Sequence, residues 1–347
     1  DLVRSRGLGD VYKRQQYNSK MSKKNIAVVM GGYSDEYKVS LKSGQLIFES
    51  LDRELYNVYK VVILKDEWYF LDENGDKKNI NKADFSIHLE NGENLKFDAC
   101  FNTIHGTPGE NGIMQAYWDA VGQKYTGCDF YQSALTFNKK DTLAVLSKYG
   151  IPSAKSIYLR NGEEISDDEI VEKLGLPVFV KPNQSGSSLG ISKVKDKIEL
   201  KNAIEFAYKE DDEILIESAL NGMEVSVGVL DYQGEVIVLG ITEIVPDKEF
   251  FDYEAKYEGA SQEITPARID EETRKKVEEI SIKAYKSLGM SGFSRSEFII
   301  VDGIPHLLEM NTNPGFSPAS ILPQQAKIYG ISIKDLCGNE VEKALNK

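Results

Sequence analysis

Residues 293–315 read FSRSEFIIVDGIPHLLEMNTNPG, the most informative pattern in the chain. Two runs of strand-forming residues flank an Asp302-Gly303 turn signal, and this combination predicts a β-hairpin. Four polar side chains, two on each run, interrupt the apolar residues: Arg295, Glu297, Glu309 and Asn311. Because side chains alternate between faces along a strand, the two polar side chains of each run share one face of their strand.

The register of this hairpin decides whether its carboxylates meet. An odd-numbered loop, or a β-bulge, places Glu297 opposite Glu309, whereas a strict two-residue loop places them on opposite faces. Facing carboxylates repel unless a cation lies between them, and Glu and Asn oxygens are ligands that suit Mg²⁺. Arg295 beside that metal could stabilise developing negative charge. Taken alone, this pattern favours a surface hairpin with solvated charges. The Asn-Thr-Asn-Pro-Gly sequence that follows the second strand, at 311–315, begins to favour a metal site instead.

The composition is that of an acidic globular chain. It has 347 residues, 41% hydrophobic and 28% charged, which is enough for two or three packed domains. Its 42 Lys and Arg residues against 55 Asp and Glu residues give a net charge of −13. An acidic chain without a basic block is a poor partner for nucleic acid or an anionic membrane, and we attribute the acidity to solubility.

Cysteine usage and hydropathy favour a cytoplasmic protein. Cys100, Cys128 and Cys337 are scattered and show no metal or redox spacing, which suits a reducing compartment. No apolar run approaches the length that spans a membrane, and no charged-then-apolar leader with a small-residue cleavage site is present.

The first twenty residues do not follow any pattern of packed structure. Residues 10–15 resemble the in-frame translation of a sequencing-adapter end, so we expect residues 1–20 to be a non-native leader. The alternative is a genuine polar arm. Neither interpretation predicts packed structure there.

Alternating strands and helices predict a parallel α/β domain at residues 21–127. Its expected strands are 25–30, 58–64 and 98–105, and its expected helices are 36–51 and 113–121. A Gly31-Gly32 turn follows the first strand. It is only a weak nucleotide signal, because the dinucleotide fingerprint G-x-G-x-x-G is absent.

Two α+β blocks are expected next, at residues 128–217 and 218–347. The first is expected to contain strands at 176–181, 191–194 and 213–217 and a helix at 200–209. The second is expected to contain strands at 225–230 and 236–241, a helix ending at Leu288, and the hairpin. Asn138, Ser166 and Asp270 are the expected N-cap residues of three helices.

Further segments could carry chemistry, although each has a plainer explanation. In residues 181–190 (KPNQSGSSLG), Lys181 precedes small residues whose backbone N–H groups can approach an anion, but a flexible loop explains them as well. Residues 213–220 could contact an adenine and a ribose, or be a buried strand with solvated ends. Residues 251–257 (FDYEAKY) suggest a lid, or a loop packed on the surface.

His105 follows an apolar strand at the ligand-binding edge of α/β sheets, but a lone histidine is more often structural.

In their order, these signals resemble the D-alanine–D-alanine ligases of the ATP-grasp superfamily. The resemblance covers residues 21–347 and rests on six ordered motifs. They are Gly31-Gly32-x-Ser34-x-Glu36-x-x-Val39-Ser40, His105-Gly106 with Gly109-Glu110-x-Gly112, Tyr125-Thr126-Gly127, Lys181-Pro182 to Gly190, Asp252-Tyr253-x-x-Lys256-Tyr257, and Glu309-x-Asn311-Thr312-x-Pro314-Gly315. The resemblance implies an α/β and α+β ATP-grasp fold, in which a Rossmann-like parallel-sheet domain precedes two α+β domains that clasp ATP.

The resemblance also implies an activity and its cofactors. The enzyme would join two D-alanine molecules through an acyl phosphate, for peptidoglycan precursor synthesis, using ATP and two Mg²⁺ ions, with Mn²⁺ as a substitute. Glu297, Glu309 and Asn311 would bind the metal, with Glu309 bridging the two ions. The implied nucleotide contacts are Lys139, Lys181, Glu217, Leu220, Glu224 and Lys256. The implied partner is D-alanine, with no nucleic acid or membrane, and the implied assembly is a homodimer.

Roles in substrate binding and catalysis follow from the same resemblance. Glu36 would anchor the amino group of the first D-alanine and link through Ser187 to Tyr257, which would lock the lid. His105 would orient the first D-alanine. The intermediate would be stabilised by Arg295 and the Gly315 N–H, and the carboxylate of the second D-alanine would be bound by Ser320, with Ile321 beside it.

Two positions depart from the family pattern, and the sequence leaves three rival functions to consider. Glu297 stands where the family usually has Asp, and Ile321 stands where Leu is common. The nearest rival is another ATP-grasp carboxylate–amine ligase, including one that accepts D-lactate. Tyr257 disfavours the D-lactate version, because such relatives usually lack this tyrosine. A non-catalytic nucleotide-binding protein is disfavoured by the retained substrate, phosphate and metal residues. A dinucleotide oxidoreductase is disfavoured by the missing fingerprint.

Overall fold

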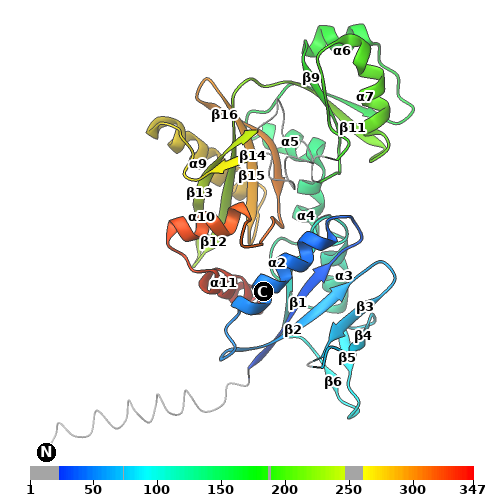
Figure 1. Ribbon diagram of the computed structural model, residues 1–347, viewed down its shortest axis with the longest axis vertical. Coiled ribbons are helices and arrows are strands. Elements are labelled where there is room, and N and C mark those ends of the chain that lie inside the picture. The colour runs from blue at the N-terminus through cyan, green and yellow to red at the C-terminus, as the bar shows by residue number, and fades with distance from the viewer. Residues whose placement is uncertain (1–22, 73, 187–188, 247–260) are drawn as a thin grey trace, which may run out of the picture.

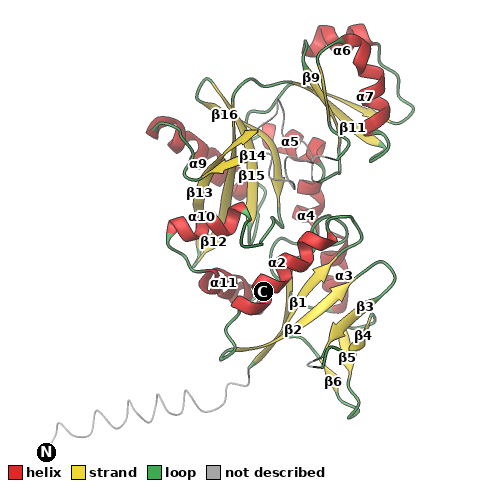
Figure 2. Cartoon of the chain, in the orientation of Figure 1, coloured by secondary structure: helices red, strands yellow, loops and turns green. Residues whose placement is uncertain are grey.

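The computed structural model describes residues 23–72, 74–186, 189–246 and 261–347, and its strands form three sheets (Figure 1). The sheets contain seven, four and five strands and follow one another along the chain. Figure 2 shows helices packed beside all three. The leader expected at residues 1–20 and the lid expected at 251–257 lie outside the described residues.

The first sheet has a parallel core, as the sequence predicts. β1 (Lys24–Gly31) lies between β2 (Tyr56–Ile63) and β7 (Ala99–Asn102), and both pairings are parallel. Alternate residues of β1 point to opposite faces. One face packs with helix α2 (Tyr37–Ser50), and the other with helix α3 (Ile113–Val121).

An antiparallel extension, which the sequence reading did not foresee, widens this sheet. Its strands are β3 (Trp68–Leu71), β4 (Lys77–Asn81), β5 (Ser86–His88) and β6 (Asn94–Leu95). They continue the sheet from β2 by antiparallel pairing. These strands are two to five residues long, too short to carry a clear hydrophobic periodicity.

The second sheet is antiparallel and forms the green end of the molecule in Figure 1. Its strands, in spatial order, are β10 (Ser192–Val194), β9 (Val178–Pro182), β11 (Glu213–Ser218) and β8 (Ser156–Arg160). Its apolar core includes residues of helices α6 (Asp167–Leu174) and α7 (Leu200–Ala207). Helices α4 (Phe130–Phe137) and α5 (Lys139–Ser147) precede it in the chain.

The third sheet contains the hairpin. Its strands, in spatial order, are β14 (Ser261–Ile264), β13 (Glu235–Pro246), β12 (Met223–Tyr232), β15 (Ser294–Val301) and β16 (Ile304–Asn311). The loop between β15 and β16 has two residues, Asp302 and Gly303, both at positive φ (49° and 73°). This is the backbone that a type I′ turn requires, which explains the Asp-Gly sequence.

A β-bulge in this hairpin settles the register. Leu308 is the extra residue, because Phe298 pairs with Leu307 while Glu297 pairs with Glu309. Arg295 then lies opposite Asn311. The tight loop alone would separate the two carboxylates, and the bulge restores them to one face.

The predicted helix starts are confirmed. The side chains of Asn138, Ser166 and Asp270 accept backbone N–H hydrogen bonds from Asp141, Glu169 and Thr273, respectively. Asp270 begins helix α9 (Glu271–Ser287), which packs on the third sheet. Each cap satisfies an N–H group that has no partner within its helix.

The C-terminal helices connect the third sheet to the first. Helix α10 (Ile321–Tyr329) packs on β12 and β13, and helix α11 (Ile333–Leu345) packs on α2 and β7. One apolar cluster therefore includes residues of β1, such as Val28, together with Leu336 and Val341 of α11. This shared core holds the loops of the first sheet against the hairpin of the third.

Candidate active site

A cleft of about 870 Å³ opens between the second and third sheets and reaches the loops of the first. Every predicted site residue that the structure describes lines it: Glu36, His105, Lys139, Lys181, Glu217, Leu220, Glu224, Arg295, Glu297, Glu309, Asn311, Gly315, Ser320 and Ile321. Ser187, Lys256 and Tyr257 lie outside the described residues. Residues from three sheets thus converge on a cavity of the size that holds a drug-sized ligand.

The acidic hairpin is held in the cleft by two cations. The Nε of Arg295 donates to Glu297 Oε1 at 2.7 Å, and Lys139 Nζ lies 3.1 Å from Glu309 Oε2. Glu297 is 9% exposed, so its charge needs a partner. Burial disfavours the charge of Arg295, but Glu297 and Glu309 outweigh burial and raise its pKa, so the guanidinium stays charged.

The oxygen atoms on this face fit a magnesium site. Glu297 and Glu309 face each other across paired strands, and Asn311 follows Glu309 on the same face. Within the described chain, no three His, Cys, Asp or Glu side chains gather as a self-sufficient metal cluster. Mg²⁺ in phosphoryl-transfer sites needs only one or two carboxylates, since substrate phosphates and water complete its shell. Two carboxylates and an amide are therefore a suitable donor set.

Two buried lysines face the cleft from neighbouring elements. Lys139, at the start of α5, donates to the Ser185 carbonyl at 2.7 Å as well as contacting Glu309. Lys181, on β9, lies 2.7 Å from Glu217 Oε2 on β11. Both lysines are 7% exposed. A cation that is buried and already oriented can exchange its carboxylate for an anionic ligand with little loss of side-chain entropy.

An apolar wall in the same cleft was missed by the sequence reading. Its side chains come from four separate elements and include Ala154, Phe179, Ile299, Leu308 and Met310. Ile299 and Leu308 are half-buried positions of the hairpin. A planar, largely apolar group such as a nucleobase suits this wall. These residues come together only in the tertiary structure. From sequence periodicity alone, each of them would be assigned to an ordinary apolar core.

His105 holds the loop that follows the hairpin. Its Nδ1 lies 2.7 Å from the Asn313 carbonyl, and its Nε2 lies 3.0 Å from Ser43 Oγ. A carbonyl can only accept, so Nδ1 carries the proton and Nε2 accepts from the Ser43 hydroxyl. Burial lowers the pKa of His105, which keeps the ring neutral. Ser43 Oγ also accepts from the Phe316 N–H at 3.0 Å, so both ends of the loop are fixed.

Gly106 lies between two carboxyl groups. Its N–H donates to Glu110 Oε2 at 2.9 Å, and a Cβ at this position would lie 2.7 Å from Glu36 Oε2. The backbone is left-handed there, with a φ of 63°, so glycine serves both the turn and the close approach. Burial, with Glu36 adding to it, raises the pKa of Glu110 to about 8. Its place in the Gly109-Glu110-x-Gly112 motif does not by itself assign Glu110 a role.

Ser320 stands at the N-terminus of helix α10. Its hydroxyl accepts from the Ser317 N–H at 2.9 Å, rather than capping the helix, and Gly315 lies close by. Helix N-termini favour anions because their N–H groups point outward without partners. The position therefore suits a carboxylate, as the resemblance implies.

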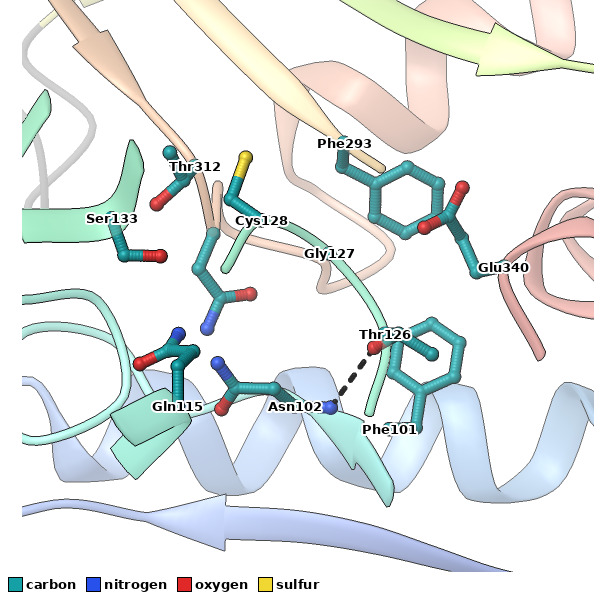
Figure 3. A pocket seen from close by; sticks show the side chains of 11 residues that line it. Phe101, Asn102, Gln115, Thr126, Gly127, Cys128, Ser133, Phe293, Thr312 and Glu340 are labelled. Atoms are coloured by element: carbon teal, nitrogen blue, oxygen red, sulfur yellow. Dashed lines mark hydrogen bonds between the residues drawn. The ribbon is translucent and has the colours of Figure 1, made fainter. Parts of the chain in front are cut away.

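A second, much smaller cavity lies between the first domain and the segment after the hairpin (Figure 3). It has a volume of about 20 Å³, room for a single water molecule, so it is not a substrate site. Figure 3 shows Asn102 and Gln115 of the first domain facing Thr312 and Ser133, with Glu340 of α11 at one side. Glu340 is 2% exposed, and burial raises its pKa to about 7, although Lys343 and Lys347 oppose the shift.

Glu340 makes stability depend on pH. Its folded-state pKa lies above the ordinary value of 4.5, so the folded state loses stability as pH rises from about 4.5 through about 7. Glu340→Gln cannot ionise, so its stability relative to the wild type should grow by about 2 kcal/mol between about pH 5 and pH 8. Urea unfolding of both proteins across that range measures the difference. A difference that stays constant with pH would contradict the assignment.

None of the helices in the described part of the chain combines the length and the apolar character that crossing a membrane requires.

Comparison with known proteins covers nearly the whole chain. Residues 25–128 match the family described as "D-ala D-ala ligase N-terminus", and residues 145–342 match the family described as "D-ala D-ala ligase C-terminus". The D-alanine–D-alanine ligase of Flavobacterium johnsoniae is 59% identical over 322 residues, covering 93% of this chain and 99% of the relative. That of Bacteroides fragilis strain YCH46 is 40% identical over 321 residues, covering 92% and 99%.

Solved structures give the same result. The VanG D-Ala:D-Ser ligase from Enterococcus faecalis matches with a TM-score of 0.84 and 34% identity, covering 92% of this chain and 99% of that one. The D-alanine–D-alanine ligase of Bacillus anthracis in complex with ATP matches with a TM-score of 0.75 and 29% identity, covering 93% and 98%. The similarity thus includes all three sheets and the cleft between them.

Proposed function

The chain belongs to the D-alanine–D-alanine ligase family, and we propose that its cleft joins two D-alanine molecules at the expense of ATP, for cell-wall precursor synthesis. The observation that carries the proposal is the convergence of the acidic hairpin, two buried lysines and the Glu36–His105 loops on one cavity. Each of these parts meets a different need of the reaction.

The first step transfers a phosphoryl group. The carboxylate of the first D-alanine attacks the γ-phosphorus of ATP, the bond to the β,γ-bridging oxygen breaks, and an acyl phosphate and ADP form. Lys139 and Lys181 bind the phosphates in exchange for their present carboxylate partners. Glu217, Leu220 and Glu224 hold the nucleoside, with the apolar wall against the base.

The metal would be held by Glu297, Glu309 and Asn311, whose oxygens share one face of the hairpin. When bound, Mg²⁺ neutralises phosphate charge and orients the transfer. Glu297 is one methylene longer than the Asp that the family pattern implies at this position, and the Arg295 Nε donates to one of its oxygens. Glu297 therefore offers the same carboxylate oxygens as an Asp would, on a longer side chain.

The second step forms the peptide bond. The neutral amine of the second D-alanine attacks the acyl carbon, the nitrogen loses one proton to solvent, and the tetrahedral intermediate then expels phosphate. Arg295 lines the cleft and, with the Gly315 N–H, would stabilise the developing oxyanion. Ser320 at the N-terminus of α10 receives the carboxylate of the second D-alanine. The resemblance assigns Ser187 and Tyr257 to closure of the site over the acyl phosphate and Lys256 to nucleotide binding, and all three lie outside the described residues.

Phosphate release from ATP tests the function directly. Purified protein is supplied with D-alanine, L-alanine, D-serine or D-lactate, alone and in pairs with D-alanine, and the products are identified by mass spectrometry. D-Alanine alone should give ADP, phosphate and D-alanyl-D-alanine, because it can fill both substrate sites. A preference for D-serine or D-lactate as the second substrate would instead indicate a ligase of altered acceptor specificity.

Location and assembly complete the proposal. We infer a cytoplasmic enzyme, supported by three buried cysteines that are all free of disulfides. We also infer a homodimer from the family resemblance. Sedimentation velocity at several concentrations distinguishes a dimer from a monomer.

A further inference from the structure

Gln325 is a buried polar side chain to which the proposed reaction assigns no part. It lies on helix α10 and is fully buried. Its Nε2 donates to the Ser226 carbonyl at 3.0 Å and to Thr242 Oγ1 at 2.9 Å. A carbonyl can only accept, so the contact with Ser226 fixes which end of the amide carries the hydrogens. An apolar side chain would be buried here at lower cost, so the hydrogen bonds are what Gln325 contributes.

Two glycines form the notch in the third sheet that receives Gln325. A Cβ on Gly228 would lie 2.3 Å from Gln325 Oε1, and a Cβ on Gly240 would lie 3.2 Å from its Cγ. Gly228 and Gly240 are direct partners on the neighbouring strands β12 and β13. Close packing against the two glycines, together with the two acceptors of Nε2, therefore fixes where this side chain stands on the sheet.

The rows of the sheet beneath Gln325 lead to the reaction centre. Directly opposite residues of antiparallel strands share one face of the sheet. Gly228 pairs with Arg295 on β15, and Ser226 pairs with Glu297. Gln325 therefore stands on the same face of the sheet as the guanidinium and the carboxylate proposed to bind the metal, one strand away from them.

Helix α10 also carries the position proposed for the second substrate. Ile321 lies four residues before Gln325, so the two side chains share one face of the helix, about one turn apart. Ser320 precedes Ile321 at the helix N-terminus, and both residues line the cleft. A shift or rotation of α10 on the sheet would therefore move Ser320 relative to Arg295.

We propose that Gln325 is a positioning residue, which sets helix α10 on the sheet and thereby aligns the carboxylate of the second D-alanine with the reaction centre. The inference rests on the proposed function, because it takes D-alanine as the second substrate. Gln325 acts through Ser320 and touches no substrate itself. Its loss should impair the second step of the reaction and leave the first step, which uses ATP and the first D-alanine, unchanged.

Two products separate these steps. When hydroxylamine is present, it traps the acyl phosphate of the first step as D-alanine hydroxamate, which requires no carboxylate at Ser320. Gln325→Met keeps the length of the side chain and removes its hydrogen bonds. In this variant the kcat/KM for the second D-alanine should fall by about tenfold to a hundredfold, while hydroxamate formation should stay within about twofold of the wild type.

Two further variants test the anchor and control for stability. Gly228→Ala places a Cβ where Gln325 Oε1 now lies, so it should displace Gln325 and divide the two products in the same way. Val277→Ala is the matched control, because Val277 is fully buried on α9, against the opposite face of the same sheet. Its melting temperature should fall, but the ratio of the two products should equal that of the wild type.

The outcomes distinguish this inference from the proposed function. Equal losses of both products in Gln325→Met and Gly228→Ala, or no loss of either product, would overturn the positioning role of Gln325. A wild-type protein that forms no D-alanyl-D-alanine would instead refute the proposed function.

Discussion

Glu309→Gln is expected to lower kcat by about a thousandfold or more while leaving the fold intact. Glu309 lies opposite Glu297 on the hairpin and 3.1 Å from Lys139. The metal-binding role proposed for Glu309 uses the two anionic oxygens of a carboxylate, whereas an amide offers one neutral acceptor. The side chain keeps its size, and its remaining oxygen can still accept from Lys139. The variant should therefore lose turnover while its packing stays unchanged.

The test measures both the turnover rate and the melting temperature. Phosphate release is followed as a function of Mg²⁺ concentration for the wild type and the variant, and the melting temperature of each is recorded. Glu213→Gln is a suitable control, because Glu213 also pairs a strand carboxylate with a neighbouring lysine, Lys140, but lies outside the cleft. Wild-type turnover in Glu309→Gln, with the same dependence on Mg²⁺, would refute a metal-binding role for Glu309.

The hairpin shows what sequence can and cannot predict here. The Asp-Gly turn and the alternation of polar side chains predict two paired strands and the residues on each face. They do not predict the register, because a two-residue loop separates Glu297 from Glu309 unless a bulge intervenes. The bulge at Leu308 places an apolar side chain on the wall of the cleft. The bulge depends on tertiary contacts, so no local sequence pattern predicts it.

The sequence alone assigns no role to residues whose properties depend on contacts with distant parts of the chain. Lys139 could be placed at a helix start, because the Asn138 cap is a local signal. Glu110 and Glu340 are single acidic residues in ordinary surroundings along the chain. Their raised pKa values come from burial against segments distant in sequence. The short strands β3 to β6 were missed for a related reason, since pairing with β2 and with each other, rather than periodicity, makes them strands.

Arg295 supports both the reaction and the fold, and the two contributions can be separated. Arg295→Ala is expected to lower kcat by about a hundredfold to a thousandfold, the usual loss when one donor to a developing oxyanion is removed. It should also destabilise the protein, because Glu297, at 9% exposure, loses the guanidinium that lies 2.7 Å away. A drop in activity by itself would therefore be ambiguous, since a damaged hairpin would produce it too.

Arg295→Lys resolves the ambiguity. A lysine at this position keeps a positive charge beside Glu297, so most of the stability should return, as a melting curve would show. Its ammonium lacks the planar fork of the guanidinium and cannot bond Glu297 and the intermediate in the same geometry. Turnover should therefore stay at least about tenfold below the wild type, with the KM for ATP little changed. If turnover in Arg295→Lys instead recovers together with stability, Arg295 serves the fold as a counter-charge and the oxyanion is stabilised elsewhere.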